Sequence, residues 1–375
     1  MTNTLGLYVH IPFCLSKCLY CDFCSFPRME TETVTAYANE LCRRMAGATT
    51  DAAKRTVDTV YFGGGTPTLL PLACFSQLLN TIRTHFSLAD DCEITVECNP
   101  ATADLAYLSA LRSLGVNRLS IGLQSIHDNE LRALGRAHTF ADFEAVFADA
   151  RRAGFDNISA DLMYGIPHQT EDSFRKSIEA LCALSPEHIS AYGLKIEEGT
   201  PFFQKKSTLL LPDEDTEYRM YLLLSHVLGE NGYAKYEISN FAKSGRHSRH
   251  NLRYWHGEEY LGFGVAAHSY FGGVRFGNSR DMNAFLRGED IVEERVCLSP
   301  HEREEEAVML ALRLSEGISQ SKFFAMTGEE FTIRYPTVRR MIEAGFMKEE
   351  NGRISFTDRG FFVSNAILAE MLDFD

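Results

Sequence analysis

The chain has 375 residues, of which 45% are hydrophobic and 23% are charged, the balance of a globular protein with a sizeable core. A net charge of −14 argues against a partner held through its phosphates, so we expect no nucleic-acid binding. The first residues lack the basic stretch and long apolar run of a secretory signal, and no segment approaches the roughly 20 apolar residues that span a bilayer. A cytoplasmic protein without a transmembrane segment is therefore expected.

Short apolar strands alternate with amphipathic helices over residues 1–212. Six strands are predicted, at residues 5–9, 57–62, 93–97, 118–122, 158–163 and 188–192. Helices are predicted at residues 33–45, 72–85, 103–114, 140–153 and 172–184, where apolar residues recur three and four positions apart. This alternation is typical of a parallel α/β sheet, and six such units predict a partial (β/α)6 barrel, not a closed eight-stranded one.

The alternation stops near Glu197. A helix is predicted at 216–228, whereas residues 233–277 are rich in Gly, His and aromatic residues and have no clear period. The rest predicts helices at 302–314 and 338–344, a hairpin over 346–356 that turns at Asn351-Gly352, and a helix at 357–372. That order is typical of a winged-helix-like α+β unit, but its 14 acidic and 9 basic residues do not suit DNA binding. We therefore predict a division of the chain into residues 1–212, 213–298 and 299–375.

Four of the ten cysteines fall within eleven residues: Cys14, Cys18, Cys21 and Cys24. Thiolates are the usual ligands of iron–sulfur clusters, and three on one loop can hold three irons of a cubane while the fourth iron stays open. The open iron can chelate the amino and carboxylate groups of S-adenosylmethionine (SAM), and an electron from the cluster then cleaves the sulfonium to a 5′-deoxyadenosyl radical. Structural zinc is a weaker alternative because its cysteine pairs usually come from separated knuckles. A redox CxxC would need a thioredoxin-like context, which is absent.

Glycine and polar residues follow five of the predicted strands, and the carboxyl ends of parallel strands meet at one edge of a sheet. They are the cysteine loop and residues 63–67, 97–100, 122–125 and 161–167. Such residues suit SAM, because its ammonium needs acceptors, its carboxylate needs a cation and glycine lets the backbone approach closely. Taken singly, the glycine run could be a tight turn, Arg136 a surface residue, and Glu97 and Asp161 helix N-caps.

The spacing CxxxCxxC directly after the first strand resembles the radical-SAM superfamily. The longer run from Tyr8 to Cys14, with Tyr20-Cys21-Asp22-Phe23, resembles the branch that contains oxygen-independent coproporphyrinogen III oxidase and the HemW haem chaperones, and the resemblance covers essentially the whole chain. It implies a [4Fe–4S] cluster on Cys14, Cys18 and Cys21. It also implies SAM contacts by Tyr8 beside the sulfonium, Gly64, Gly65 and Thr66 at the methionyl end, Glu97 and Gln124 as polar contacts, Arg136 at the carboxylate and Asp161 at the ribose.

Two features separate the branches. The oxidase carries a cysteine two residues after its third, where this chain has Phe23, and we expect Cys24, one residue further on, not to bind the cluster. The run from His250 to Trp255 matches the HNxxYW motif of the HemW family, and the resemblance implies that His250, Tyr254 and Trp255 handle haem. Without the resemblance, His250 and Trp255 are expected to form a hydrogen-bonded core pair beside the barrel.

The resemblance therefore implies a haem-binding chaperone of the radical-SAM superfamily, with haem and haem-accepting proteins as partners. Respiratory acceptors and a homodimer stay open, as do covalent haem attachment and productive cleavage of SAM. The alternative is an oxygen-independent coproporphyrinogen III oxidase, which would decarboxylate its substrate through the radical.

Overall fold

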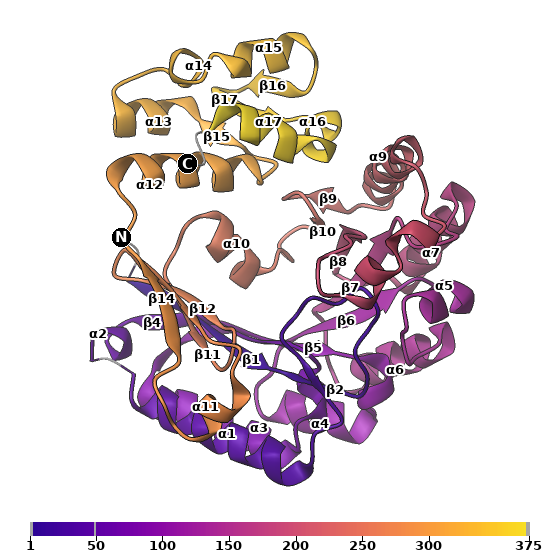
Figure 1. The fold of residues 1–375 in the computed structure, drawn as a ribbon, viewed down its shortest axis with the longest axis vertical. Coiled ribbons are helices and arrows are strands. Elements are labelled where there is room, and N and C mark those ends of the chain that lie inside the picture. Colours follow the sequence, from indigo (N-terminus) through magenta and orange to yellow (C-terminus); the bar gives the residue numbers. More distant parts are fainter. Residues whose placement is uncertain (1–2, 49, 373–375) are drawn as a thin grey trace.

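The computed structural model describes residues 3–48 and 50–372, with a smaller α+β unit packed beside a barrel-like sheet (Figure 1). Six parallel strands form the centre of the sheet: β1 (Thr4–Ile11), β4 (Thr56–Gly64), β5 (Ser87–Cys98), β6 (Arg118–Gln124), β7 (Ile158–Tyr164) and β8 (His188–Gly193). They lie side by side in chain order, so the predicted partial (β/α)6 barrel is confirmed.

Helices cover the outer face of these strands (Figure 1). They are α1 (Thr31–Ala46), α2 (Thr50–Ala53), α3 (Leu72–His85), α4 (Leu105–Ser113), α5 (Asp128–Ala133), α6 (Phe140–Arg152) and α7 (Glu171–Leu184), with 3-10 turns η1 (Pro67–Leu69) and η2 (Pro100–Thr102). The five longer helices were all predicted, because their buried residues follow the helical period, as Phe75, Leu78 and Ile82 do in α3. Capping boxes at Thr139 and Thr170 start α6 and α7.

The next part of the chain adds strands to both edges of the sheet. Its elements are α8 (Pro201–Gln204), η3 (Lys206–Thr208), α9 (Glu214–Glu230), β9 (Ala234–Lys235), β10 (Asn240–Ala242), α10 (Arg249–Trp255), β11 (Tyr260–Phe263), β12 (His268–Phe271), β13 (Val274–Asn278), α11 (Met282–Leu286) and β14 (Val292–Val296). β10 pairs antiparallel with β8, whereas β11 pairs in parallel with β1, which makes a twelve-stranded sheet within residues 3–48 and 50–372. These strands have two to five residues, too few for a hydrophobic period to show.

The C-terminal unit has a core of its own, which includes Val308, Phe331 and Ile354. Its elements are α12 (Pro300–Leu312), β15 (Ile318–Ser319), α13 (Gln320–Thr327), α14 (Phe331–Arg334), α15 (Thr337–Glu343), β16 (Met347–Glu350), β17 (Arg353–Phe356), α16 (Asp358–Phe362) and α17 (Ser364–Met371). The hairpin turns at Asn351 and Gly352, both at positive φ, so the predicted winged-helix-like α+β unit is confirmed.

One predicted element of this unit is wrong. The single helix expected over 357–372 is two helices, interrupted at Val363. The Ser364 hydroxyl donates to the Phe361 carbonyl and accepts from the Arg313 guanidinium, and such side-chain bonds compete with the helical backbone.

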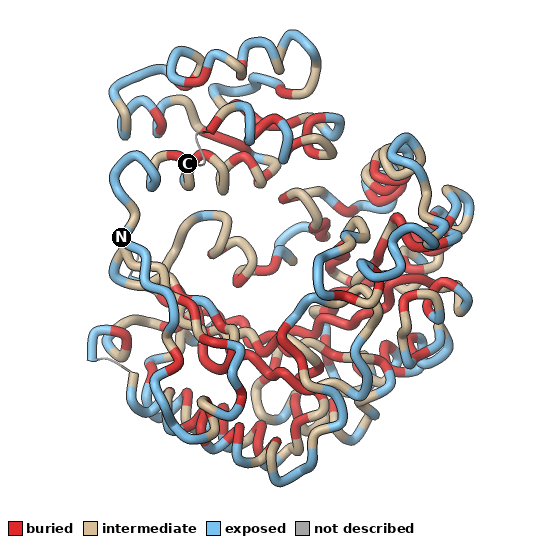
Figure 2. Tube along the Cα trace, in the orientation of Figure 1, coloured by how far each residue is buried: buried red, intermediate tan, exposed pale blue. Residues whose placement is uncertain are grey.

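Buried residues concentrate in the strands, on the inner sides of the helices and in a second band inside the C-terminal unit (Figure 2). No helix in the described part of the chain is long and apolar enough to cross a membrane. The predicted division of the chain after residues 212 and 298 stays a prediction. Its first part begins, and its last part ends, with residues outside those that the structure describes.

Candidate functional site

A loop at the carboxyl end of β1 carries the clustered cysteines. It is closed by β2 (Phe13–Cys14), which pairs in parallel with β3 (Phe26–Pro27). Cys14, Cys18 and Cys21 are half-buried, whereas Cys24 is buried. The middle of the loop is tied to the barrel, because the Leu19 N–H donates to the Leu134 carbonyl and the Phe202 N–H donates to that of Leu19, each at 3.0 Å.

Two opposing influences act on the three half-buried cysteines: burial disfavours the thiolate form, whereas hydrogen-bond donors near the sulfurs stabilise negative charge. Partial burial raises the pKa of the Cys14 and Cys21 thiols. Two donors point at the sulfurs: the Thr66 hydroxyl lies 3.8 Å from Cys14 Sγ, and Arg136 Nη1 lies 3.7 Å from Cys18 Sγ. Among the described residues no three His, Cys, Asp or Glu side chains are placed to hold one metal ion. In a cubane each cysteine sulfur binds a separate iron, so the three thiols of this loop would hold a cluster without sharing one ion.

The glycines Gly63, Gly64 and Gly65, at the carboxyl end of β4, lie beside the cysteine loop. A side chain on Gly64 or Gly65 would collide with neighbouring atoms. Gly64 has a φ of +114°, and a Cβ there would lie 2.5 Å from the His10 ring. A Cβ on Gly65 would lie 2.6 Å from the Phe13 carbonyl oxygen and 3.0 Å from Cys14 Sγ. The strand-end backbone therefore approaches the cluster loop as closely as glycine allows.

Glu97, at the carboxyl end of β5, faces this turn. Its carboxylate accepts hydrogen bonds from the Tyr61 hydroxyl at 2.8 Å and from the Gly64 N–H at 3.1 Å. Desolvation inside the barrel, reinforced by Asp161, raises the pKa of Glu97 to about 7, although both hydrogen bonds oppose the shift. A carboxylate in this setting is a strong acceptor for an ammonium group.

Arg136, Gln124 and Asp161 complete the rim. Arg136 Nη2 donates to the Gly122 carbonyl at 2.9 Å, while its Nε, shielded from solvent, has no hydrogen-bond partner among the described residues. Gln124 ends β6 with a φ of +75°, a strained conformation for a residue with a side chain. Asp161 accepts from the Ser120 hydroxyl at 3.3 Å, and desolvation raises its pKa. The orphaned Arg136 Nε fits an incoming anionic group such as the SAM carboxylate.

Tyr8 and His10 line the same inner face of β1. The Tyr8 hydroxyl donates to His10 Nδ1 at 3.0 Å, because His10 Nε2 must carry the proton that it donates to the Cys24 carbonyl, 2.9 Å away. The structure thus brings all eight predicted SAM residues to the rim beside the cysteine loop. The structure adds His10 and Tyr61, which the sequence analysis missed. Residues two apart in a strand share one face, so the position of His10 two residues after Tyr8 was a signal that could have identified it, and the alternation in β4 was the signal for Tyr61.

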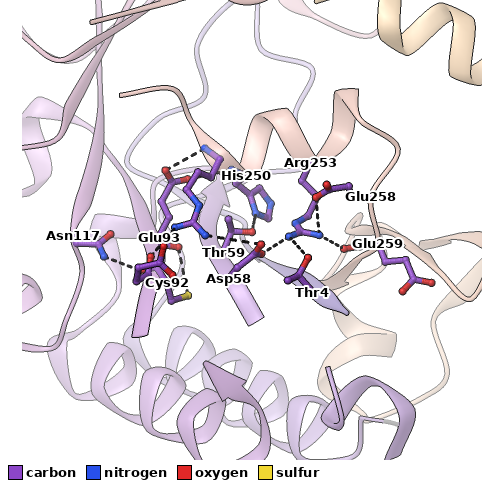
Figure 3. A network of polar contacts seen from close by, with 12 residues as sticks. Thr4, Asp58, Thr59, Cys92, Glu93, Asn117, His250, Arg253, Glu258 and Glu259 are labelled. Atoms are coloured by element: carbon purple, nitrogen blue, oxygen red, sulfur yellow. Dashed lines mark hydrogen bonds and ion pairs between the residues drawn. The ribbon is translucent and has the colours of Figure 1, made fainter. Parts of the chain in front are cut away.

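The HNxxYW segment lies in α10, which packs on the inner face of the sheet (Figure 3). It contacts β4 at Thr59, nearer the amino-terminal end of that strand than Gly64. His250 is 1% exposed, with Nδ1 hydrogen-bonded to Thr59 Oγ1 at 2.9 Å and Nε2 to the Tyr254 hydroxyl at 2.8 Å. Burial lowers the pKa of His250 to about 3, so its ring is neutral. Both ring nitrogens are engaged by Thr59 and Tyr254, so the hydrogen-bonded pair of His250 with Trp255 that was expected without the resemblance does not form in the described structure. Trp255, the last residue of α10, is half-buried.

A model of the radical SAM superfamily matches residues 8–181, the span that holds the cysteine loop and every predicted SAM residue. A HemN C-terminal domain model matches residues 298–363. Fold, cysteine loop and strand-end rim together define a radical-SAM protein.

Full-length relatives narrow the family. The chain is 34% identical to a heme chaperone HemW of Bacillus subtilis, over 97% of this chain and 98% of that protein. It is 33% identical to a heme chaperone HemW of Synechocystis, over 97% and 95%. The chain belongs to the HemW family. Coproporphyrinogen III oxidase (HemN) of Escherichia coli, a radical SAM enzyme, has the same fold, with a TM-score of 0.84 and 23% identity over 98% of this chain and 89% of that one.

Proposed function

We propose that this protein is a haem-binding chaperone that carries a [4Fe–4S] cluster and SAM and delivers haem to acceptor proteins. The observation that carries the proposal is full-length similarity to proteins named heme chaperones, and the radical SAM superfamily match over residues 8–181 supports it. At the position of the oxidase's additional cysteine stands Phe23, which is 68% exposed and offers no thiolate. A cytoplasmic location, respiratory acceptors and a homodimer stay predictions.

The rim residues have separate tasks in this proposal. Cys14, Cys18 and Cys21 would hold the cluster, which supplies an electron to SAM when both are bound. Glu97 accepts from the SAM ammonium, and Arg136 donates to its carboxylate. Gly64, Gly65 and Thr66 let the methionyl end approach, with Tyr8 beside the sulfonium. Asp161 offers an acceptor to the ribose, and Gln124 is a further polar contact to SAM.

Haem needs an apolar face and an axial ligand. His250 was the expected ligand, with Tyr254 and Trp255 beside it, but iron could reach it only after a hydrogen bond to Thr59 or Tyr254 breaks. The imidazoles of His247, His256 and His268 in the same region are exposed, although His256 Nε2 lies 3.6 Å from a Glu316 carboxylate oxygen and the His247 ring stacks on Tyr236. We therefore propose that haem binds this region and that one of these exposed imidazoles is the axial ligand.

The test is anaerobic haem titration of the full chain, with and without reconstituted cluster. We expect a saturable Soret band near one haem per chain and transfer of that haem to an apo-acceptor. Single His247→Ala, His256→Ala and His268→Ala variants should identify the ligand by a shifted band, while His250→Ala should leave it in place. Absence of haem binding together with decarboxylation of coproporphyrinogen III would instead establish the oxidase.

SAM binding is tested separately. Arg136→Ala should weaken SAM by roughly 2–4 kcal/mol, because the carboxylate loses its charged donor inside the barrel. The measurement is equilibrium binding to the cluster-loaded chain. Equal SAM affinity of the wild type and Arg136→Ala would remove Arg136 from the proposed site.

A further inference from the structure

We propose that Tyr61 is a positioning residue of the SAM site and that the HNxxYW segment serves this site by holding the Tyr61 ring against Glu97. The inference rests on the proposed SAM binding at the strand ends. It gives His250 and Tyr254 a task that does not involve iron.

The first step is the bond between Tyr61 and Glu97. The Tyr61 hydroxyl is one of two donors to the carboxylate, the other being the Gly64 N–H on the opposite oxygen. Two fixed donors on different oxygens set the plane of the carboxylate and leave its remaining lone pairs for a ligand. The ammonium of SAM would meet a carboxylate already oriented, so less ordering is needed on binding.

The second step is the support of the Tyr61 ring. The ring stacks on His250 with 5.2 Å between centroids and 24° between planes, and on Tyr8 at 6.2 Å and 26°. Tyr8 and His250 are themselves 6.4 Å apart at 28°. The three rings therefore form a triangular cluster in which each ring packs against the other two, and its two tyrosines line the proposed SAM site.

The third step is the fixing of His250. Thr59, two residues before Tyr61 on β4, binds Nδ1, and Tyr254, one turn further along α10, binds Nε2. The ring cannot rotate without losing a hydrogen bond in a buried setting, which costs about 1–3 kcal/mol. The His250 ring therefore gives the Tyr61 ring a fixed surface to pack against.

The fourth step is the anchoring of α10 (Figure 3). The Glu93 carboxylate accepts from the Arg249 and His250 N–H groups, each at 3.2 Å. Arg253 is 2% exposed and pairs with Asp58 and, at 3.2 Å, with Glu258. Glu93, in the middle of β5, thus holds the start of the helix, and Asp58, near the beginning of β4, holds its end, so the motif is fixed to the inner face of the sheet beside the Tyr61 ring.

The charged and titratable groups around Glu97 decide in which direction the pH midpoint of SAM binding should move. Asp161 raises the pKa of Glu97, Arg118 and the Tyr61 hydrogen bond lower it, and Tyr8 and Tyr254 face it as neutral phenols. Removing the Tyr61 hydroxyl takes away a contact that favours the carboxylate. The pKa of Glu97 then rises, and SAM binding, which needs the charged form, begins at a higher pH.

The experiment measures the dissociation constant of SAM for the full, cluster-loaded chain from pH 6 to 9. Tyr61→Phe should weaken SAM about tenfold at pH 7, move the midpoint of the pH profile upward and recover most affinity at pH 9. Tyr254→Phe and His250→Ala should move the midpoint in the same direction, and His250→Gln, which keeps a donor and an acceptor, should restore it. Tyr233→Phe is the matched control, because its hydroxyl donates to the Pro186 carbonyl at 2.8 Å, away from the rim.

The outcomes separate the two proposals. A wild-type chain that binds no SAM overturns the proposed function and this inference with it. Normal binding by the wild type with an unchanged profile in Tyr61→Phe overturns this inference alone. If Tyr61→Phe does not fold, Tyr254→Phe decides in the same way. A higher pH midpoint of SAM binding in Tyr254→Phe supports the proposal that the motif holds Tyr61 in place, and an unchanged midpoint overturns it.

Discussion

His10 Nε2 donates a hydrogen bond to the carbonyl oxygen of Cys24, 2.9 Å away, and so ties the inner face of β1 to the far end of the cysteine loop. The bond crosses from the strand before the loop to Cys24, three residues after Cys21, the last expected ligand. It therefore fixes the backbone of the loop without using any thiol.

His10→Ala should keep the cluster at first but lose it several-fold faster under a chelator, because the loop end is no longer held. The measurement is the decay of absorption near about 400 nm under anaerobic conditions. His127→Ala is the control, since His127 also bonds a backbone carbonyl, that of Ser173 at 3.1 Å, away from the loop. Equal decay rates for both variants would show that the His10 bond does not stabilise the loop.

Ligation by three cysteines predicts unequal effects of the four thiols. Cys14→Ala, Cys18→Ala or Cys21→Ala should each abolish cluster absorption and bound iron after reconstitution, whereas Cys24→Ala should keep both. The reason is that Cys24 is buried and contributes its carbonyl to His10, a contact that alanine preserves. A Cys24→Ala chain as iron-free as Cys18→Ala would refute the open-iron arrangement.

Glu97 should make stability depend on pH. The pKa of Glu97 is raised from 4.5, its ordinary value, to about 7 in the folded chain. Between these two pH values the folded state binds more protons than the unfolded state, so the free energy of unfolding falls as pH rises from 4.5 through 7. Glu97→Gln removes this cost and should raise the unfolding free energy at pH 8 by about 1–3 kcal/mol, with little effect at pH 4.5, while SAM binding is lost.

Thermal melting at pH 5, 6, 7 and 8 with equal cluster loading checks this dependence. Glu179→Gln serves as the control because Glu179 is exposed and makes only a long ion pair with Arg175 at 3.9 Å. A difference between Glu97→Gln and the wild type that stays constant with pH would mean that Glu97 is charged in both states throughout.

The sequence predicted the barrel and the rim because both depend on local order. Each strand end carries its glycine or polar residue within a few positions, and parallel strands bring those ends together whatever the exact register. Cys14, Gly64 and Glu97 could therefore be placed at one edge of the sheet from strand order alone, whereas Arg136, which follows α5, was assigned only from the family resemblance.

The support beneath the rim could not be predicted. The bond between Thr59 and His250 joins residues 191 positions apart, and it exists only because α10 returns to the inner face of β4. β11 inserts beside β1 although the paired residues, such as Gly6 and Tyr260, are 254 positions apart, and its four residues carry no detectable period. His250 was assigned to haem from its motif, whereas its burial and both of its partners depend on this tertiary return.

Lys235 on β9 joins the barrel sheet to the C-terminal unit. Its ammonium lies 2.5 Å from Asp358 on α16 and 3.0 Å from the Tyr221 hydroxyl. It also lies 4.3 Å from the ring centroid of Tyr221, 5.2 Å from that of Phe241 and 5.4 Å from that of Phe361. A lysine that is 10% exposed among three rings and a carboxylate gains both cation–π and charged hydrogen-bond energy.

Lys235→Met keeps the length and apolar contacts of the side chain but removes the charge, so it should destabilise the junction by about 1–2 kcal/mol. Asp358 is about half exposed and can be hydrated once it is alone, so the barrel itself should stay folded. We expect a lower midpoint of thermal unfolding for the C-terminal unit and faster protease cleavage near residues 297–299, with cluster and SAM binding kept. Lys348→Met, which removes an exposed lysine paired with Glu350 at 2.8 Å within one hairpin, should change neither. Equal cleavage rates for both variants would show that Lys235 does not hold the two units together.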